Sequence, residues 1–291
     1  MIRIIVFLAM MLGAATLLAQ DFATAVKSTQ VVPGIFLVEG ADGFAGGNMT
    51  LLVGDDRVVM IDDGVEPVAA ALIGTAESIA GRPVDFIVNT HVHGDHVGGN
   101  AAYADAGATV FAHDNIRKRL LEDTSLAGGP AGLPIVTFDD AVTFHVNGLE
   151  AYVFHVESAH TDGDAAIEFR GANVIHAGDV FFNYLFPFID LDNGGSVAGF
   201  VAAQERIIAM SDDETIIIPG HGPLAGKSDL QTAISVLVDC EARVKALVDA
   251  GKSIEEVLAE NPLAIYHDTW NWGFITTEKM TETLYRSLTS E

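Results

Sequence analysis

The segment that most constrains this chain is Thr90–Asn100, where three histidines and one aspartate fall within six residues in the sequence THVHGDHVGGN. It follows the Val/Ile-rich run 85–89, so we expect a tight loop between the end of a strand and a helix that opens near His96. By composition, the pattern His-x-His-x-Asp-His is expected by chance in about one of a thousand such sequences. Imidazoles and a carboxylate together suit Zn²⁺, whereas Mg²⁺ and Ca²⁺ prefer oxygen ligands.

This loop predicts two metal positions. In an extended segment His91 and His93 point the same way, because side chains alternate with a period of two residues. Asp95 and His96 lie beyond the intervening glycine and aim at a different point. A pair of metal ions about 3.5–4 Å apart is typical of two-metal hydrolases.

Further ligands are available at three later positions. His160, Asp179 and His221 each come shortly after an apolar, β-branched run. The single cysteine, Cys240, excludes an internal disulfide framework and any Cys-rich zinc site. We interpret Cys240 as a core residue, because it falls on the apolar stripe of a predicted helix.

Short β-rich runs alternate with helical patterns along the chain. With 49% apolar and 19% charged residues, the sequence can bury a sizeable core. We expect strands at 34–38, 50–53, 58–61, 86–88, 151–156, 165–169, 174–177 and 215–218, and helices at 67–80, 196–210 and 229–249. The Gly/Pro-rich stretch 126–134 is too short to divide the chain. The pattern favours a single α/β domain over residues 20–291, with two packed sheets and helices on the outer faces.

Residues 1–19 have the features of a cleaved signal peptide. Arg3 precedes an uninterrupted apolar run from Ile4 to Ala19, and polar residues follow. A membrane anchor is the alternative, but the run is short for a bilayer span and ends in small residues. We expect a periplasmic or secreted protein that makes no membrane contact once this peptide is removed.

The charge balance argues against polyanionic partners. The chain has 15 Lys and Arg against 40 Asp and Glu, a net charge of −25. Removal of Arg3 with the leader leaves 14 against 40, or −26. Such a field repels nucleic acid and anionic lipid, so we expect a small-molecule substrate; the sequence carries no signal for an oligomeric state.

The order of these motifs, from the Asp62-Asp63-Gly64 turn through HVHGDH to the PGHGP loop, resembles the metallo-β-lactamase superfamily over nearly the whole mature chain. The resemblance implies an αβ/βα four-layer sandwich with the site at one edge of the sheets. It further implies two Zn²⁺ ions, the first held by His91, His93 and His160, the second by Asp95, His96 and His221, with Asp179 bridging both and Asp62 beneath the metal loop.

One departure from this family bears on the substrate. The cysteine-containing true β-lactamases have a ligating cysteine where this chain has Asp179, and a lysine shortly after it that holds the drug's carboxylate. Here Arg206 is the only basic residue between Asp179 and His221. The bridging aspartate is instead similar to glyoxalase II and to lactonases.

We therefore predict an exported di-zinc hydrolase in which a bridging hydroxide cleaves a carbonyl ester, thioester or lactone. Asp95 is assigned the catalytic role of holding the hydroxide's proton. A β-lactamase is the alternative. A di-iron redox protein of the same fold is a remote one, because that pattern has Glu where this chain has His93.

Substrate-contacting residues are less well specified by the sequence. Phe44 lies in the glycine-rich stretch 40–48, which suits either a mobile flap or a plain hairpin loop. Phe181 and Tyr184 belong to an aromatic run after Asp179, and Trp270 precedes the last helix. We expect these four aromatic residues near the substrate. His176, three residues before Asp179, is expected to support the ligands from behind.

Overall fold

The computed structural model describes residues 22–290. The predicted signal peptide, residues 1–19, lies outside the described residues and remains a prediction. Within residues 22–290, no helix combines the length and apolar character needed to cross a membrane.

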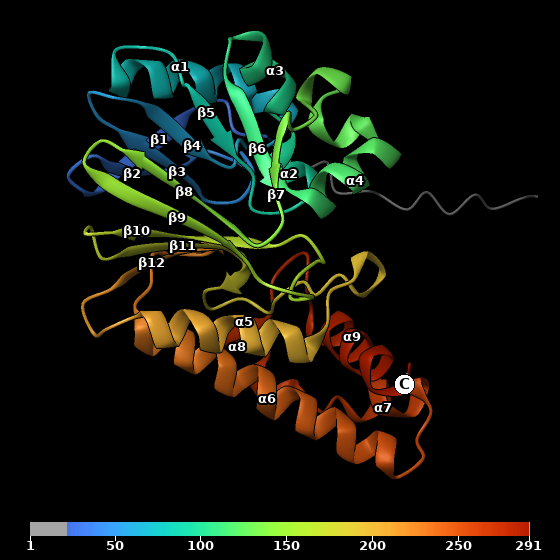
Figure 1. The fold of residues 1–291 in the computed structure, drawn as a ribbon. Coiled ribbons are helices and arrows are strands. Elements are labelled where there is room, and N and C mark those ends of the chain that lie inside the picture. The colour runs from blue at the N-terminus through green and yellow to red at the C-terminus, as the bar shows by residue number, and fades with distance from the viewer. Residues whose placement is uncertain (1–21, 291) are drawn as a thin grey trace, which may run out of the picture.

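The described chain folds into four layers, helix–sheet–sheet–helix (Figure 1). The first sheet has seven strands in the order β1-β2-β3-β4-β5-β6-β7, and the second has five in the order β12-β11-β10-β9-β8. Helices α1, α3 and α4 cover the first sheet, α5 and α6 cover the second, and α9 packs against α6 and α7 (Figure 1). The expected αβ/βα sandwich is confirmed.

The elements have the following bounds. The strands are β1 (Val26–Val32), β2 (Ile35–Gly40), β3 (Met49–Val53), β4 (Val58–Ile61), β5 (Phe86–Val88), β6 (Thr109–His113), β7 (Val136–Phe138), β8 (Ala141–Val146), β9 (Leu149–His155), β10 (Ala165–Arg170), β11 (Val174–Phe182) and β12 (Ile216–His221). The α-helices are α1 (Ala69–Ala80), α2 (Gly94–Val97), α3 (Asn100–Asp105), α4 (Asp114–Glu122), α5 (Val197–Met210), α6 (Lys227–Asp249), α7 (Ile254–Glu260), α8 (His267–Trp270) and α9 (Thr277–Thr289).

Both faces of the central strands are buried. On β3, Leu51 packs into the cluster under α1, whereas Leu52 packs into the cluster between the two sheets. Because neighbouring strand residues point to opposite faces, such strands have continuous apolar sequences. The apolar run at 58–61 becomes β4 for the same reason, with every residue buried.

Helix α6 confirms the predicted apolar stripe. Leu230, Leu237, Cys240 and Val244 are buried in the cluster beneath the second sheet. Burial raises the pKa of the Cys240 thiol to about 12, so this cysteine is an inert core residue.

The structure corrects the prediction of the strands in two respects. Strands β1, β6, β7 and β8 were not expected; β1 was missed because its residues from Lys27 to Gln30 are exposed and polar. Strand β11 also extends to Phe182, so Asp179 lies inside a strand and not after its end. Pairing with β12 continues past irregularities on either side of Gly178, whose φ of 54° breaks the regular ladder beside the ligand.

Candidate metal centre

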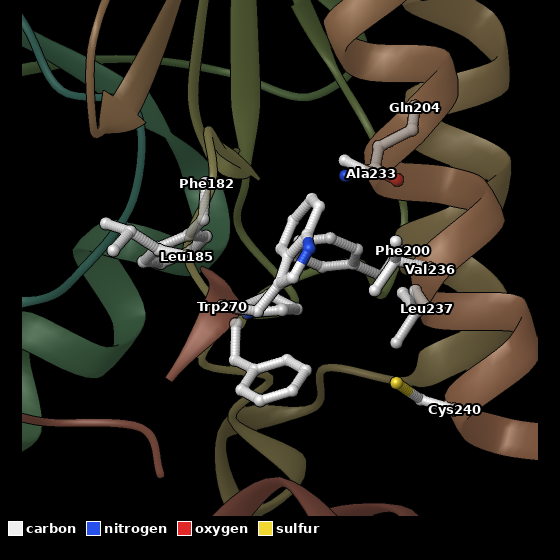
Figure 2. A pocket seen from close by; sticks show the side chains of 11 residues that line it. Phe182, Leu185, Phe200, Gln204, Ala233, Val236, Leu237, Cys240 and Trp270 are labelled. Atoms are coloured by element: carbon white, nitrogen blue, oxygen red, sulfur yellow. The ribbon is translucent and has the colours of Figure 1, made fainter. Parts of the chain in front are cut away.

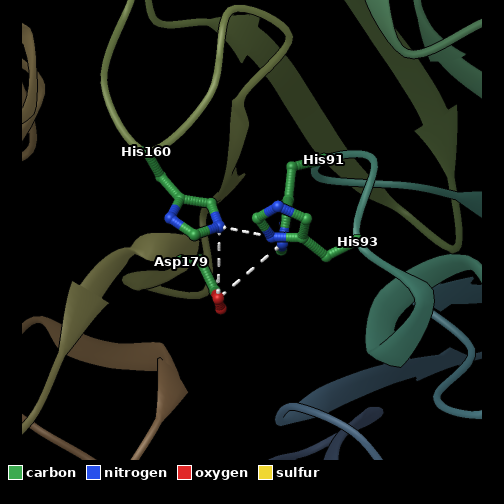
Figure 3. Close-up of side chains that lie close together, drawn as sticks. All are labelled: His91, His93, His160 and Asp179. Atoms are coloured by element: carbon green, nitrogen blue, oxygen red, sulfur yellow. Dashed lines mark hydrogen bonds and ion pairs between the residues drawn. The ribbon is translucent and has the colours of Figure 1, made fainter. Parts of the chain in front are cut away.

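The first group of ligand-type side chains gathers at one edge of the two sheets. His91, His93, His160 and Asp179 each present one donor atom, and these atoms all lie within 4.8 Å of one another. Figure 3 shows the four side chains converging from the loop after β5, the loop after β9 and strand β11. His160 Nε2 lies 2.8 Å from His93 Nδ1 and 3.5 Å from Asp179 Oδ2.

The second group lies directly beside the first. Asp95, His96 and His221 again place one donor atom each within 4.8 Å of the others. Asp179 reaches this group as well, because its Oδ1 is 3.2 Å from His96 Nε2 and its Oδ2 is 3.5 Å from His221 Nε2. The carboxylate of Asp179 therefore stands between the two groups, and the structure brings all seven predicted ligands together.

Several of the atoms that could bind a metal ion in this centre are buried and have no hydrogen-bond partner. They are His91 Nε2, His96 Nε2 and Asp179 Oδ1. Buried polar atoms are normally paired, because leaving one unsatisfied costs about 1–3 kcal/mol. A metal ion at each group would satisfy these atoms, and nitrogen with carboxylate oxygen is a donor set that Zn²⁺ accepts.

Asp62 fixes the loop and one of its histidines. The backbone N–H and the hydroxyl of Thr90 both donate to the Asp62 carboxylate, each at 2.7 Å. His96 Nδ1 lies 2.7 Å from the same carboxylate, so His96 presents its Nε2 to the centre. Asp62 has a φ of 58°, in the left-handed region that aspartate tolerates better than most residues. The predicted supporting role of Asp62 agrees with this geometry.

His176 lies behind Asp62, one contact farther from the candidate ligands. Its Nδ1 lies 2.8 Å from the Thr50 hydroxyl, and its Nε2 lies 3.8 Å from Asp62 Oδ2. It therefore faces Asp62 and not the metal groups.

Sequence reasoning missed Asp190, which holds His93 from behind. Asp190 Oδ2 lies 2.9 Å from His93 Nε2, and the side-chain amide of Asn193 donates to the same oxygen at 2.7 Å. His160 is held in the same way, with its Nδ1 2.6 Å from the carbonyl oxygen of Phe188. An acidic residue after the aromatic run was the only available signal, and nothing in its spacing connects it to His93.

The electrostatics separate the histidines into two kinds. Burial, aided by the neighbouring imidazole of His93, lowers the pKa of His160 to about 4, so His160 is neutral and ready to act as a ligand. Burial also opposes protonation of His96, but the carboxylates of Asp179, Asp95 and Asp62 outweigh it and raise the pKa of His96 well above its usual value. The carboxylates around His96 therefore favour a positive charge at this group.

A cleft of about 420 Å³ opens above the two groups. His93, Asp95, Asp179 and His221 form its base. The aromatic residues that line it are Phe22, Phe44, Phe182, Phe188, Trp272 and Phe274. This volume falls within the range of about 300–1,000 Å³ typical of small-molecule sites.

Of the four aromatic residues expected near the substrate, the structure places only Phe44 in this cleft. Phe181 is fully buried in the core, and the irregularity of β11 between Gly178 and Phe182 places Phe182 on the cleft side with Asp179 instead. Tyr184 is 51% exposed and bonds to Asp229. Trp270 lines a small cavity between the chain after β11 and helices α5 and α6, near Cys240 (Figure 2). These three expectations are therefore corrected.

The loop that carries Phe44 is tied to the metal loops. Gly47 N–H donates to the carbonyl oxygen of Asp95 at 3.2 Å, and Asn48 N–H donates to that of Gly220 at 2.7 Å. The Asn48 side chain donates to the carbonyl oxygen of Pro219 at 2.8 Å. Of the two alternatives for this stretch, the bonding pattern agrees with a hairpin loop held in place.

Comparisons with known proteins agree with this geometry. Residues 42–221, more than half of the chain, match the family model of the metallo-beta-lactamase superfamily. A hydroxyacylglutathione hydrolase of Anaeromyxobacter dehalogenans is 30% identical over 172 residues, which are 59% of this chain and 59% of that protein. One of Pelagibacter ubique is 30% identical over 99 residues, which are 34% of this chain and 36% of that protein. The chain thus matches between a third and three fifths of the length of these relatives.

Solved structures share the fold at low sequence identity. A metallo-beta-lactamase from Pontibacter korlensis has a TM-score of 0.65 at 19% identity, covering 74% of this chain and 99% of that one. The DIM-1 metallo-beta-lactamase has a TM-score of 0.63 at 17% identity, covering 74% of this chain and 97% of that one. With the layered fold, the clustered His and Asp side chains and the family match over 42–221, this chain belongs to the metallo-β-lactamase superfamily.

Proposed function

We propose that this protein is an exported di-zinc hydrolase that cleaves a carbonyl ester, a thioester or a lactone. The observation that carries the proposal is the pair of ligand groups sharing Asp179, in which buried donor atoms have no partner within the described protein. The relatives named hydroxyacylglutathione hydrolase support hydrolysis of an acyl compound.

The chain's residues would divide the work as follows. His91, His93 and His160 would hold one zinc ion, Asp95, His96 and His221 the other, and Asp179 both. When bound, such a pair supplies a bridging hydroxide at neutral pH and polarises a carbonyl oxygen. The carboxylate of Asp95 is 25% exposed at the cleft, against 5% for Asp179, and this exposure supports our assignment of Asp95 as the group that would hold a proton and release it to the leaving group.

The test is a hydrolysis screen on zinc-loaded protein comprising residues 20–291. It includes a 4-nitrophenyl ester, an aliphatic thioester, a γ-lactone, nitrocefin and bis(4-nitrophenyl) phosphate. We expect turnover of one or more of the first three. Turnover of nitrocefin alone would make the protein a β-lactamase, and turnover of the phosphodiester alone would contradict the proposal.

Two histidine variants locate the chemistry. His93→Ala should lower kcat/KM at least about a hundredfold, since even loss of a residue behind a metal ligand costs about 10–100-fold. His145→Ala is the matched control, because that side chain is 71% exposed and lies outside the centre. Elemental analysis should give two zinc ions per chain; two iron ions without zinc would favour the redox alternative.

Export is tested separately. Cells expressing the full chain should contain a shortened protein in the periplasm or medium, with an N-terminus near residue 20. A variant lacking residues 1–19 should stay in the cytoplasm. Recovery of the full-length chain in the membrane fraction would contradict cleavage and favour an anchor.

A further inference from the structure

The aromatic wall of the cleft is continuous between two of the ligand histidines. The ring centroids of His221 and Trp272 are 6.0 Å apart, and those of Trp272 and Phe274 are 5.6 Å apart. Phe274 lies 5.3 Å from Phe188, which in turn stacks on His93 at 5.4 Å. A group bound next to the metal centre therefore lies against rings on this side.

Two of these rings come from the segment between α8 and α9, beyond residues 42–221 that match the family. The indole N–H of Trp272 donates to the carbonyl oxygen of Phe186 at 2.9 Å. The backbone N–H of Phe186 donates in turn to the carbonyl oxygen of Trp270 at 2.8 Å. The C-terminal segment is thus bonded to the chain that follows β11, and it holds Trp272 and Phe274 over the cleft.

No lysine or arginine lines this cleft among the described residues, and the ionisable groups that line it all belong to the metal centre. Two lysines approach its margins. Lys279 Nζ lies over the ring of Phe274, 4.8 Å from the centroid, and Lys27 is paired with Glu39 at 2.9 Å in a neighbouring groove. A carboxylate bound on the cleft side of the rings would lose its hydration, and no cationic side chain among the residues that line the cleft would pair with it.

We propose that the wall formed by Phe188, Trp272 and Phe274 makes this site selective for uncharged esters whose acyl group is apolar. This inference rests on the proposed function. Water attacks the acyl carbon, the acyl C–O bond breaks, and the proton of the water passes to the departing alkoxide, giving an acid and an alcohol. The apolar acyl group gains by burial against the rings, whereas a terminal carboxylate does not.

A pair of esters isolates the effect of the charge. 4-Nitrophenyl valerate and mono-4-nitrophenyl glutarate share a leaving group and an acyl chain length, but only the glutarate ends in a carboxylate. We expect kcat/KM for the valerate to exceed that for the glutarate by at least about tenfold, mostly through KM. Equal rates, or faster hydrolysis of the glutarate, would overturn the inference and leave the proposed function standing. Hydrolysis of neither ester, nor of 4-nitrophenyl acetate, would mean that the ester activity itself had failed.

Variants of the exposed ring test the wall directly. Phe274→Ala should lower kcat/KM for the valerate more than for the acetate, because the longer acyl chain contacts more of the wall. Phe274→Lys should raise glutarate hydrolysis relative to valerate. Ile265→Lys adds the same charge at a 63% exposed position outside the cleft lining. It should change neither the valerate-to-acetate ratio nor the glutarate-to-valerate ratio of kcat/KM. A fall in glutarate turnover in Lys279→Met would reveal a carboxylate anchor at that lysine and overturn the inference.

Binding to the metal-free protein gives a readout independent of turnover. Valerophenone and 4-benzoylbutyrate again differ in a terminal carboxylate, and Trp272 provides a fluorescence signal at the wall. The ketone should quench this fluorescence with an affinity at least about tenfold higher than the anion, an effect lost in Phe274→Lys. Tighter binding of the anion to the unmodified protein would contradict the selectivity.

Discussion

The metal centre and the aromatic wall above it differ in how deeply their side chains are buried and in the contacts that hold them. In the centre, His91, His96 and His160 are at most 1% exposed, and His96 and His160 are each oriented by a partner behind the ring. In the wall, Phe274 is 48% exposed and is held by ring contacts. A displaced ligand leaves buried polar atoms unpaired, whereas a displaced ring mainly changes what the cleft accommodates. The proposed chemistry therefore depends on the centre, and the proposed selectivity depends on the wall.

The largest expected effect is the loss of activity when Asp179, a residue of the centre and not of the wall, is replaced. Asp179→Asn removes the shared negative charge between the two groups, so we expect a loss of at least about a thousandfold in kcat and fewer than two zinc ions per chain. Steady-state kinetics and elemental analysis of the same preparation provide the measurement. Asp192→Asn is the matched control, since Asp192 is 77% exposed and pairs with Arg286. Full metal content with unchanged kcat in Asp179→Asn would show that Asp179 does not bridge the two groups.

The second effect separates the core from the wall. Phe181→Ala should lower the free energy of unfolding by about 3–5 kcal/mol, because a fully buried ring is replaced by a cavity. Its kcat and KM should stay within about twofold of the parent values in the folded, zinc-loaded protein. Phe44→Ala should do the reverse, raising KM for the valerate ester with a smaller loss of stability. Chemical denaturation gives the stability of both variants, and steady-state kinetics give their KM. A raised KM in Phe181→Ala would contradict the assignment of Phe181 to the core alone.

The same contrast explains what the sequence could predict. The candidate metal ligands could be predicted because metal binding calls for His and Asp, and four of these residues lie close together in the sequence. The wall could not be predicted, because every candidate was an aromatic residue, and it is the irregularity of β11 between Gly178 and Phe182 that turns Phe182 and not Phe181 to the cleft. The two tryptophans could not be distinguished either. The turn after α8 places Trp270 in the core and Trp272 at the cleft.

The fold shows a similar division. Strands buried on both faces, such as β3 and β4, have apolar sequences that predicted their position to within a residue or two. Strand β1 pairs only with β2 within the described sheet and exposes most of its side chains, so its sequence has no apolar signature. The interaction of Asp190 with His93 spans 97 positions of the chain and depends on tertiary structure alone.

Asp190 provides the third prediction. Asp190→Asn should weaken zinc binding at the first group by about 10–100-fold, because the partner behind His93 loses its charge. Chelator competition on the purified protein measures this affinity. The valerate-to-glutarate ratio should stay unchanged, because the wall is untouched. Unaltered zinc affinity would mean that Asp190 does not orient the histidine.

The last expected effect is the pH dependence of zinc binding, which depends on the centre and not on the wall. Burial opposes the charged form of His221, but the carboxylates of Asp179 and Asp95 prevail and raise its pKa to about 9 in the metal-free protein. His221 is therefore protonated at neutral pH, and zinc must displace that proton. Affinity should increase with pH up to about 9, by about tenfold per pH unit for the proton on His221, and displacement of the proton on His96, whose pKa is also raised, adds to this slope. Chelator competition between pH 7 and 9 measures the slope, and a flat profile would show that His221 gives up no proton to the metal. Ketone binding to the metal-free protein should vary less over the same interval, because the rings that form the wall do not titrate.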